Sequence, residues 1–129
     1  NIPMPGQFLV EAVKHQTERL ERFYGIHVEM TSHISLRLNG RLAAEAFQII
    51  SEGLSNVLRH SPAKNAFVTI LCENSQLLLQ IGNEMIADAP DVGEFIPRSI
   101  SERAPALKGK TFVERRADRY TVVHVTVPM

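Results

Sequence analysis

The sequence has little of what disulfide-stapled or membrane-spanning proteins need. Cys72 is the one cysteine among 129 residues, which excludes an intrachain disulfide framework. Its place in the apolar run 67–72 predicts a buried structural thiol. No apolar run approaches the ~18 residues that cross a bilayer, and no secretory signal is visible. We therefore expect a cytoplasmic location and no direct membrane contact.

An excess of charge of one sign is also lacking. The 14 Lys and Arg residues balance the 14 Asp and Glu residues, so the formal net charge is zero. Proteins whose whole surface attracts nucleic acid carry a positive excess, so we expect no nucleic-acid partner. The length suits one domain that buries its own core. Because the first residue is Asn1 rather than Met, we expect a piece of a longer protein.

Apolar spacing and turn residues predict alternating helices and strands. Residues 1–7 hold two prolines and a glycine and are expected to form a tether before a domain at 8–129. The expected elements are, in order, a helix at 8–24 ended by Gly25, a strand at 27–33, a long helix from the N-cap Asn39 to Ser61-Pro62, strands at 66–72 and 77–81, a loop at 82–97, a helix at 99–107, and strands at 111–116 and 121–127. This order predicts an α+β fold, a two-layer sandwich with helices packed on one face of a mixed β-sheet.

The long helix has two different faces. An apolar stripe recurs at three- and four-residue steps, at Phe47, Ile50, Leu54 and Val57. A carboxylate, an amide and an imidazole recur every four residues beside it, at Glu52, Asn56 and His60. Three such groups on one face can handle a hydrated metal and a phosphate. The alternative interpretation is a solvated face on which His60 caps the end of the helix.

Three stretches carry a resemblance to a known family. Residues 43–70, AAEAFQIISEGLSNVLRHSPAKNAFVTI, are similar to the N-box helix and following strand of the catalytic ATP-binding domain of bacterial sensor histidine kinases. Residues 8–30 resemble the segment that links the dimerisation helices of these kinases to that domain, and residues 99–128 resemble its last helix and hairpin. The resemblance is to the class with NarL-like partner regulators, in the GHKL superfamily with the Bergerat fold of gyrase, Hsp90 and MutL.

The resemblance implies a role for each matching position. Glu52 would polarise the attacking group or a metal-bound water, and Asn56 would offer its amide oxygen to Mg²⁺ on the phosphates. Arg59 and His60 would lie near the phosphate tail, and Asn83 would take the place of the aspartate that reads adenine. The implied cofactors are ATP and Mg²⁺. The implied partners are a histidine-containing dimerisation domain and a response regulator protein.

The glycine boxes of the family are degenerate in this sequence. The first box, Asp-x-Gly-x-Gly, reads Asn83-Glu84-Met85-Ile86-Ala87, so both glycines that allow close approach to a nucleotide are replaced. Asn83 retains an oxygen that accepts a hydrogen bond, although Gly82-Asn83 is also a turn dipeptide. The second box reads Glu94-Phe95-Ile96-Pro97, which lacks glycine and places a negative charge where backbone N–H groups would hold phosphate. The segment between the boxes, 88–93, is short for a lid.

Two functions follow from these patterns. The first is the ATP-binding domain of a two-component sensor histidine kinase, which passes a phosphoryl group from ATP to a histidine on a separate dimerisation domain. The second is a non-catalytic module of the same fold that binds a signalling partner without ATP turnover. The lost glycines leave open whether the chain is an enzyme. A more distant alternative is an anti-sigma-type serine kinase of the same superfamily.

Overall fold

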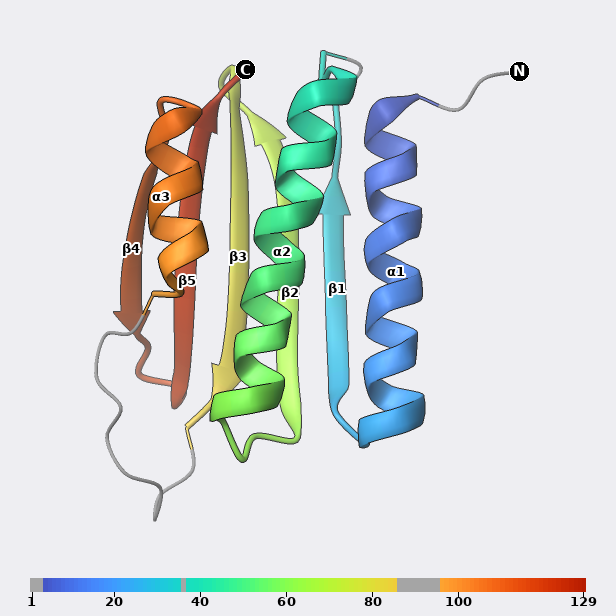
Figure 1. The fold of residues 1–129 in the computed structure, drawn as a ribbon, viewed down its shortest axis with the longest axis vertical. Coiled ribbons are helices and arrows are strands. Elements are labelled where there is room, and N and C mark those ends of the chain that lie inside the picture. The colour runs from blue at the N-terminus through green and yellow to red at the C-terminus, as the bar shows by residue number, and fades with distance from the viewer. Residues whose placement is uncertain (1–3, 36, 86–95) are drawn as a thin grey trace.

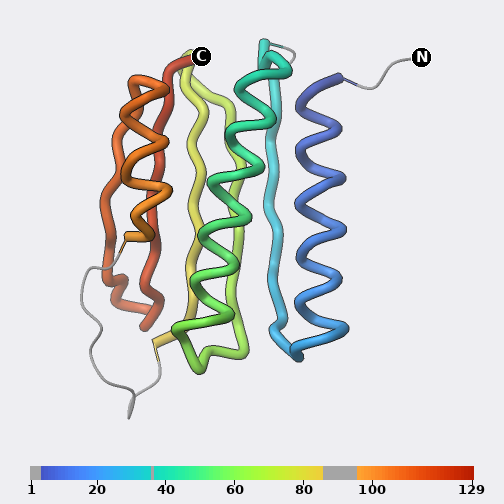
Figure 2. The backbone as a smooth tube through the Cα atoms, in the orientation of Figure 1, coloured from blue at the N-terminus to red at the C-terminus, as the bar shows by residue number. Residues whose placement is uncertain are grey.

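The computed structural model describes residues 4–35, 37–85 and 96–129. In these ranges three helices cover one face of a five-stranded sheet, as the ribbon and the backbone tube show (Figures 1 and 2). The elements in chain order are α1 (Pro5–Tyr24), β1 (His27–His33), α2 (Gly40–His60), β2 (Asn65–Glu73), β3 (Gln76–Glu84), α3 (Arg98–Ala106), β4 (Lys110–Arg115) and β5 (Tyr120–Pro128). The predicted α+β sandwich is confirmed.

The sheet is mixed, as the sequence predicts. Its strand order is β1-β2-β3-β5-β4, in which β1 and β2 run parallel and all other neighbours run antiparallel. The parallel pair needs a crossover connection, and α2 supplies it. The result is that α2 lies across the middle of the sheet, between α1 and α3 (Figure 1).

Local signals fix the ends of α1 and α2. The Asn39 side chain accepts a hydrogen bond of 2.8 Å from the Leu42 N–H, which confirms Asn39 as the N-cap of α2. Gly25 ends α1 in a left-handed conformation with φ of 68°. The helix begins at Pro5 rather than at Phe8, because proline suits the first helical position, where its missing N–H is not needed. Part of the predicted 1–7 tether is therefore helical.

Strand β3 runs further than the sequence predicts. Residues 82–84 were expected in a loop, but they pair with β5 through Gly82–Val122, Asn83–Thr121 and Glu84–Tyr120. Cross-strand pairing overrides the local turn preference of glycine and asparagine, and the turn interpretation of Asn83 is wrong. Most of the rest of the expected loop, residues 86–95, lies outside the described residues.

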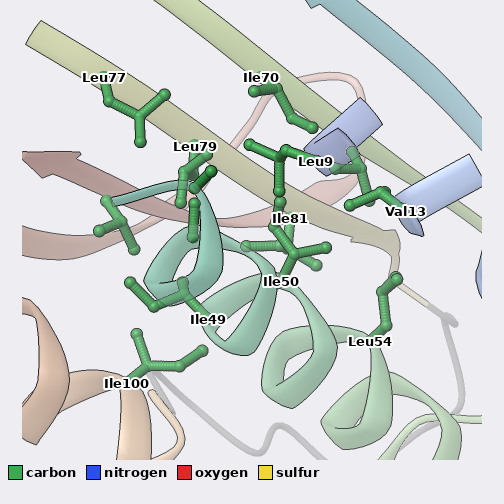
Figure 3. Close-up of a cluster of buried hydrophobic side chains, with 14 of the residues drawn as sticks. Leu9, Val13, Ile49, Ile50, Leu54, Ile70, Leu77, Leu79, Ile81 and Ile100 are labelled. Atoms are coloured by element: carbon green, nitrogen blue, oxygen red, sulfur yellow. The ribbon is translucent and has the colours of Figure 1, made fainter. Parts of the chain in front are cut away.

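The core lies between the helices and the sheet. Ile49, Ile50 and Leu54 of α2 are almost completely buried against Leu79 and Ile81 of β3 (Figure 3). The predicted apolar stripe is largely confirmed, with Phe47 half-buried at its margin, and Cys72 is buried as expected. Among the described residues, none of the helices combines the length and the continuous apolar sequence of a membrane span.

Glu84 ties the end of β3 to the connection between α2 and β2. Its carboxylate accepts hydrogen bonds from the Lys64 N–H at 2.8 Å, the Asn65 N–H at 3.1 Å and the Asn65 side-chain amide at 3.2 Å. These donors, led by the Lys64 N–H, hold the pKa of Glu84 below its ordinary value of 4.5. One carboxylate thereby satisfies two backbone donors at the start of β2.

We predict that Gly82→Ala destabilises the fold. An ideal Cβ at Gly82 would lie 2.2 Å from the Phe67 ring, which covers this glycine on the sheet face that carries no helix. Such overpacking costs about 1–3 kcal/mol. The measurement is the free energy of unfolding by urea titration. Gly40→Ala, whose Cβ meets nothing within 4 Å, is the matched control. If Gly82→Ala unfolds at the same urea concentration as wild type, the close packing of Phe67 on Gly82 is contradicted.

We predict that Glu84→Gln lowers stability at pH 7 and that this deficit shrinks in acid. Because the folded pKa of Glu84 is lowered, its contribution is present above the unfolded pKa and is lost as pH falls from 4.5 through the folded value. Urea unfolding of both proteins across this acid range measures the difference. Glu73→Gln, at an exposed glutamate at the opposite end of the β2–β3 pair, serves as the control. A deficit that stays constant with pH would contradict this role for the Glu84 carboxylate.

Candidate functional site

One flank of α2 faces α3. It carries the predicted site residues Glu52, Asn56 and His60, which recur every four positions. Glu45 on this flank forms an ion pair of 2.8 Å with Arg103 of α3, across 58 residues of sequence. Glu52 follows Glu45 by seven residues, or two helical turns, and therefore lies on the same flank. Asn56 follows one turn later. The ion pair thus shows which way the row points, namely toward α3.

Glu52 and Asn56 are half-buried, beside the fully buried Gly53 and Leu54. Within the described ranges, neither side chain forms a hydrogen bond or an ion pair with another residue. A carboxylate and an amide that are shielded from water usually have partners. These two oxygen-bearing groups therefore remain available to a ligand.

Arg59 and His60 lie in the last turn of α2 and are exposed. The predicted row of Glu52, Asn56 and His60 is therefore not equally buried along its length, because His60 lies at the exposed end of the helix. Basic residues suit this position, since the carbonyl end of a helix carries partial negative charge. They are placed to meet an anion at the end of the flank, while Glu52 and Asn56 lie deeper.

Asn83 lies on the helix-facing side of β3, next to the end of α2. Its side-chain nitrogen donates to the Glu84 carbonyl at 3.1 Å and contacts the Ser61 hydroxyl oxygen at 3.4 Å. Since Ser61 directly follows His60, Asn83 and the C-terminal end of α2 are neighbours. Glu52 and Asn56 thus lie along the flank of α2, and Arg59, His60 and Asn83 lie around its C-terminal end.

The described part of the predicted first box, residues 83–85, is tied into the sheet. The Met85 N–H donates a hydrogen bond of 2.7 Å to the Arg119 carbonyl, which closes the end of β3 against the β4–β5 hairpin. In the second box, residues 94 and 95 lie outside the described residues. Pro97 is the N-cap of α3, is buried and has no N–H to give. Met85 therefore uses its N–H within the fold, and Pro97 has none to offer a phosphate.

A metal ion at the α3-facing flank of α2 would have few ligands from the protein. No group of three or more His, Cys, Asp or Glu side chains suited to a metal exists in the described part of the chain. Magnesium in phosphate-binding sites often takes one or two protein oxygens and completes its shell with phosphate oxygens and water. The Glu52 carboxylate and the Asn56 amide oxygen fit that limited role, so the donor set suits Mg²⁺ bound together with a nucleotide.

Sequence reasoning missed two contacts that shape the site. The Glu45–Arg103 ion pair joins α2 to α3, and Glu84 fixes the start of β2 beside Asn83. Arg103 lies in the stretch 99–128 that carries part of the family resemblance, but nothing in the sequence indicated Glu45 as its partner. Such pairs depend on how the elements are arranged in space.

A comparison with known sequences gives one relative. The chain is 34% identical over 86 residues to the sensor histidine kinase LiaS of Bacillus subtilis (strain 168), a match that covers 64% of this chain and 24% of the relative. The chain thus matches about a quarter of the length of that protein. No family model matches the sequence.

Solved structures with the same fold are histidine kinase domains. The histidine kinase domain of the blue-light activated histidine kinase from Erythrobacter litoralis EL346 matches with a TM-score of 0.67 and 19% identity, over 98% of this chain and 66% of that chain. The catalytic domain of histidine kinase ThkA matches with a TM-score of 0.65 and 14% identity, over 95% and 92%. The histidine kinase domain of the E. coli osmosensor EnvZ matches with a TM-score of 0.65 and 12% identity, over 100% and 91%.

The five-stranded mixed sheet with its layer of three helices is therefore the fold of histidine kinase catalytic domains. This confirms the predicted architecture, and the sequence relative is itself a sensor histidine kinase. The identities to the solved structures are low, so the likeness to them concerns the fold. The chemistry of this chain has to be argued from its own residues.

Proposed function

We propose that this chain is the nucleotide-binding domain of a two-component sensor histidine kinase. In this role it binds ATP with Mg²⁺ and presents the γ-phosphate to a histidine on a separate dimerisation domain. The phosphorus–oxygen bond to ADP breaks, and a phosphorus–nitrogen bond to the imidazole forms. The observation that carries the proposal is the pair Glu52 and Asn56, which is half-buried on the α3-facing flank of α2 and has no side-chain partner among the described residues.

Phosphoryl transfer asks mainly for positioning and charge neutralisation. Glu52 and Asn56 are one turn apart on a helix whose opposite face is locked into the core, so their spacing is rigid. Asn56 would hold its amide oxygen toward the cation, and Glu52 would orient the attacking group. A bound Mg²⁺ supplies charge neutralisation at the phosphate oxygens.

The exposed C-terminal end of α2 would bind the phosphate tail of the nucleotide. Arg59 and His60 lie beyond Asn56 along the helix axis and are open to solvent. A guanidinium there offers charge-assisted hydrogen bonds to phosphate oxygens. Asn83, beside Ser61 on the helix-facing side of the sheet, would accept a hydrogen bond from the adenine amino group in place of the family's aspartate.

The partners follow from the same proposal. ThkA, one of the kinases with this fold, has been solved in complex with the response regulator protein TrrA, in a structure that matches this chain with a TM-score of 0.68 and 16% identity. By analogy we propose a response regulator and a histidine-bearing dimerisation domain as partners of this chain. We propose a cytoplasmic location on the same basis.

A specific observation favours the second function, a protein-binding module without ATP turnover. The Met85 N–H is already bonded to the Arg119 carbonyl, and Pro97 at the start of α3 has no N–H. A phosphate cradle needs free backbone donors at such positions. Under this alternative the domain keeps its fold and its partner contacts while nucleotide binding is lost.

We predict that a fluorescent ATP analogue with Mg²⁺ binds saturably at micromolar concentration and that Asn56→Ala weakens binding at least tenfold. The reason is that Asn56 supplies a protein oxygen to the hydrated cation. Fluorescence titration of wild type and variant measures both dissociation constants. Glu52→Gln keeps the shape of the side chain and should bind the analogue while supporting little phosphoryl transfer to a supplied dimerisation domain.

The matched control is Gln76→Ala, which removes an exposed amide at the opposite end of β3 from Asn83. It should bind the analogue as wild type does. No binding by wild type at millimolar nucleotide would contradict the kinase proposal and favour the non-catalytic module. Equal weakening by both alanine variants would show that the effect does not arise at the α2 flank.

A further inference from the structure

Strand β4 lies at an edge of the sheet and has room for a further strand. In the described sheet its one neighbour is β5, and it is the outermost strand on its side (Figure 1). It pairs with β5 residue by residue over 110–115, without a bulge and without a proline. An edge strand of this kind presents N–H and C=O groups to which an extended segment can add.

The β4–β5 hairpin shows which backbone groups point outward. The Arg116 N–H donates to the Tyr120 carbonyl at 2.8 Å, so residue 116 directs its backbone toward β5. The direction alternates along an antiparallel pair of strands. Thr111 and Val113 therefore direct their N–H and C=O groups away from β5. These four groups have no strand partner in the part of the sheet that the structure describes.

An exposed aromatic ring lies in the middle of this edge. Phe112 is 55% exposed, on the sheet face that carries no helix. Its ring stacks on His124 of β5, with 4.3 Å between the ring centroids and 4° between the planes. His124 is held in turn, since its Nε2 lies 2.9 Å from Glu114 Oε1 and its Nδ1 lies 3.4 Å from the Gln80 amide nitrogen. A ring that is fixed in advance loses little entropy on binding, and aromatic side chains are frequent anchors of interfaces.

The hairpin also carries an excess of positive charge. Residues 108–119 hold five basic and two acidic residues, in a chain whose formal net charge is zero. The basic residues are Lys108, Lys110, Arg115, Arg116 and Arg119, and the acidic residues are Glu114 and Asp118. Both acidic groups are engaged within the hairpin, Glu114 by His124 and Asp118 by Arg116. A second copy would bring the same positive excess to the edge, whereas an acidic partner would be attracted.

We propose that β4 binds an extended acidic segment of a partner protein, which adds to the sheet antiparallel to β4. Antiparallel pairing is the more stable arrangement per residue, and it lets Thr111 and Val113 each exchange two hydrogen bonds with the segment. Specificity comes from the residues between them, because side chains approach most closely at positions that do not exchange hydrogen bonds.

The side chains of β4 define the segment that fits. An aromatic or apolar residue lies opposite Phe112, and a carboxylate lies opposite Lys110. A neutral residue lies opposite Glu114, and a second carboxylate lies opposite Arg116. The partner is therefore a short strand with an apolar centre and an acidic residue toward each end.

The peptide Glu-Thr-Thr-Val-Tyr-Val-Glu, with both ends blocked, is the probe that follows from this register. We expect it to bind the 129-residue chain with a dissociation constant below about 500 μM, measured by isothermal titration calorimetry. The same peptide with lysine in place of both glutamates should bind at least about tenfold more weakly. Lys110→Glu and Phe112→Ala should each weaken binding of the acidic peptide at least about fivefold.

The matched control is Phe8→Ala, because Phe8 is 57% exposed and lies on α1. It should leave the dissociation constant unchanged. Circular dichroism of each variant checks that these exposed positions leave the fold unchanged.

Backbone methylation separates strand addition from contact through side chains alone. Methyl groups on both valine nitrogens of the peptide remove the N–H groups that face Val113 and Thr111, so binding should be lost. A methyl group on the tyrosine nitrogen, which faces away from β4, should leave binding intact. On saturation with the unmodified peptide, amide hydrogen exchange at Thr111 and Val113 should slow at least about tenfold, because their N–H groups gain acceptors.

Each alternative has its own result. No binding at about 5 mM peptide overturns the proposal, since that is weaker than specific recognition requires. Equal binding of the acidic and basic peptides overturns the acidic partner, and binding that survives valine methylation overturns strand addition. Sedimentation equilibrium of the chain alone should show a monomer, and a dimer that Phe112→Ala dissociates would assign the edge to a second copy instead. None of these readouts involves nucleotide, so they are independent of the proposed kinase function.

Discussion

The contact between α2 and β3 is the interaction on which the rest of the structure depends. Gly53 allows the two to approach closely, since an ideal Cβ there would lie 3.1 Å from Ile81. Ile49, Ile50 and Leu54 then fill the space above the central strands, and the helix has one rotational setting (Figure 3). That setting turns Glu52 and Asn56 toward α3. A rotation of α2 would expose core side chains and would move Glu52 and Asn56 together. The packing of the core therefore fixes the geometry of the candidate site.

The end of β3 beside the site is closed by three contacts rather than opened by glycines. The Glu84 carboxylate holds the start of β2, the Met85 N–H bonds to the β4–β5 hairpin, and the Phe67 ring covers Gly82. A glycine-rich loop can bring its backbone close to a nucleotide, whereas this strand end uses its backbone groups for the fold. The fold of a histidine kinase catalytic domain is thus kept, and the nucleotide contacts that we propose from the described residues lie mainly on the α2 flank.

Much of the fold can be predicted from the sequence because the signals that begin and end its helices and strands are local. Asn39 as an N-cap, Gly25 as a stop and the alternating strands each depend on a few neighbouring residues, and all are confirmed. The candidate site is predicted less completely. Spacing places Glu52 and Asn56 on one face, but it does not reveal that His60 ends up exposed. Long-range pairing carries no local signal, so neither the Glu45–Arg103 ion pair nor the extension of β3 by β5 was foreseen.

We propose that the α3-facing flank of α2 holds a cation bound to nucleotide phosphates. Nuclear magnetic resonance of the isotope-labelled chain with ATP and a trace of Mn²⁺ tests it most directly, because the paramagnetic ion broadens the signals of nearby groups. We expect the Asn56 side-chain amide to broaden first, followed by signals of Glu52 and Arg59, while Phe8 and Phe23 on α1 stay sharp. Broadening centred elsewhere, or none while Mn²⁺–ATP is in excess, would contradict it.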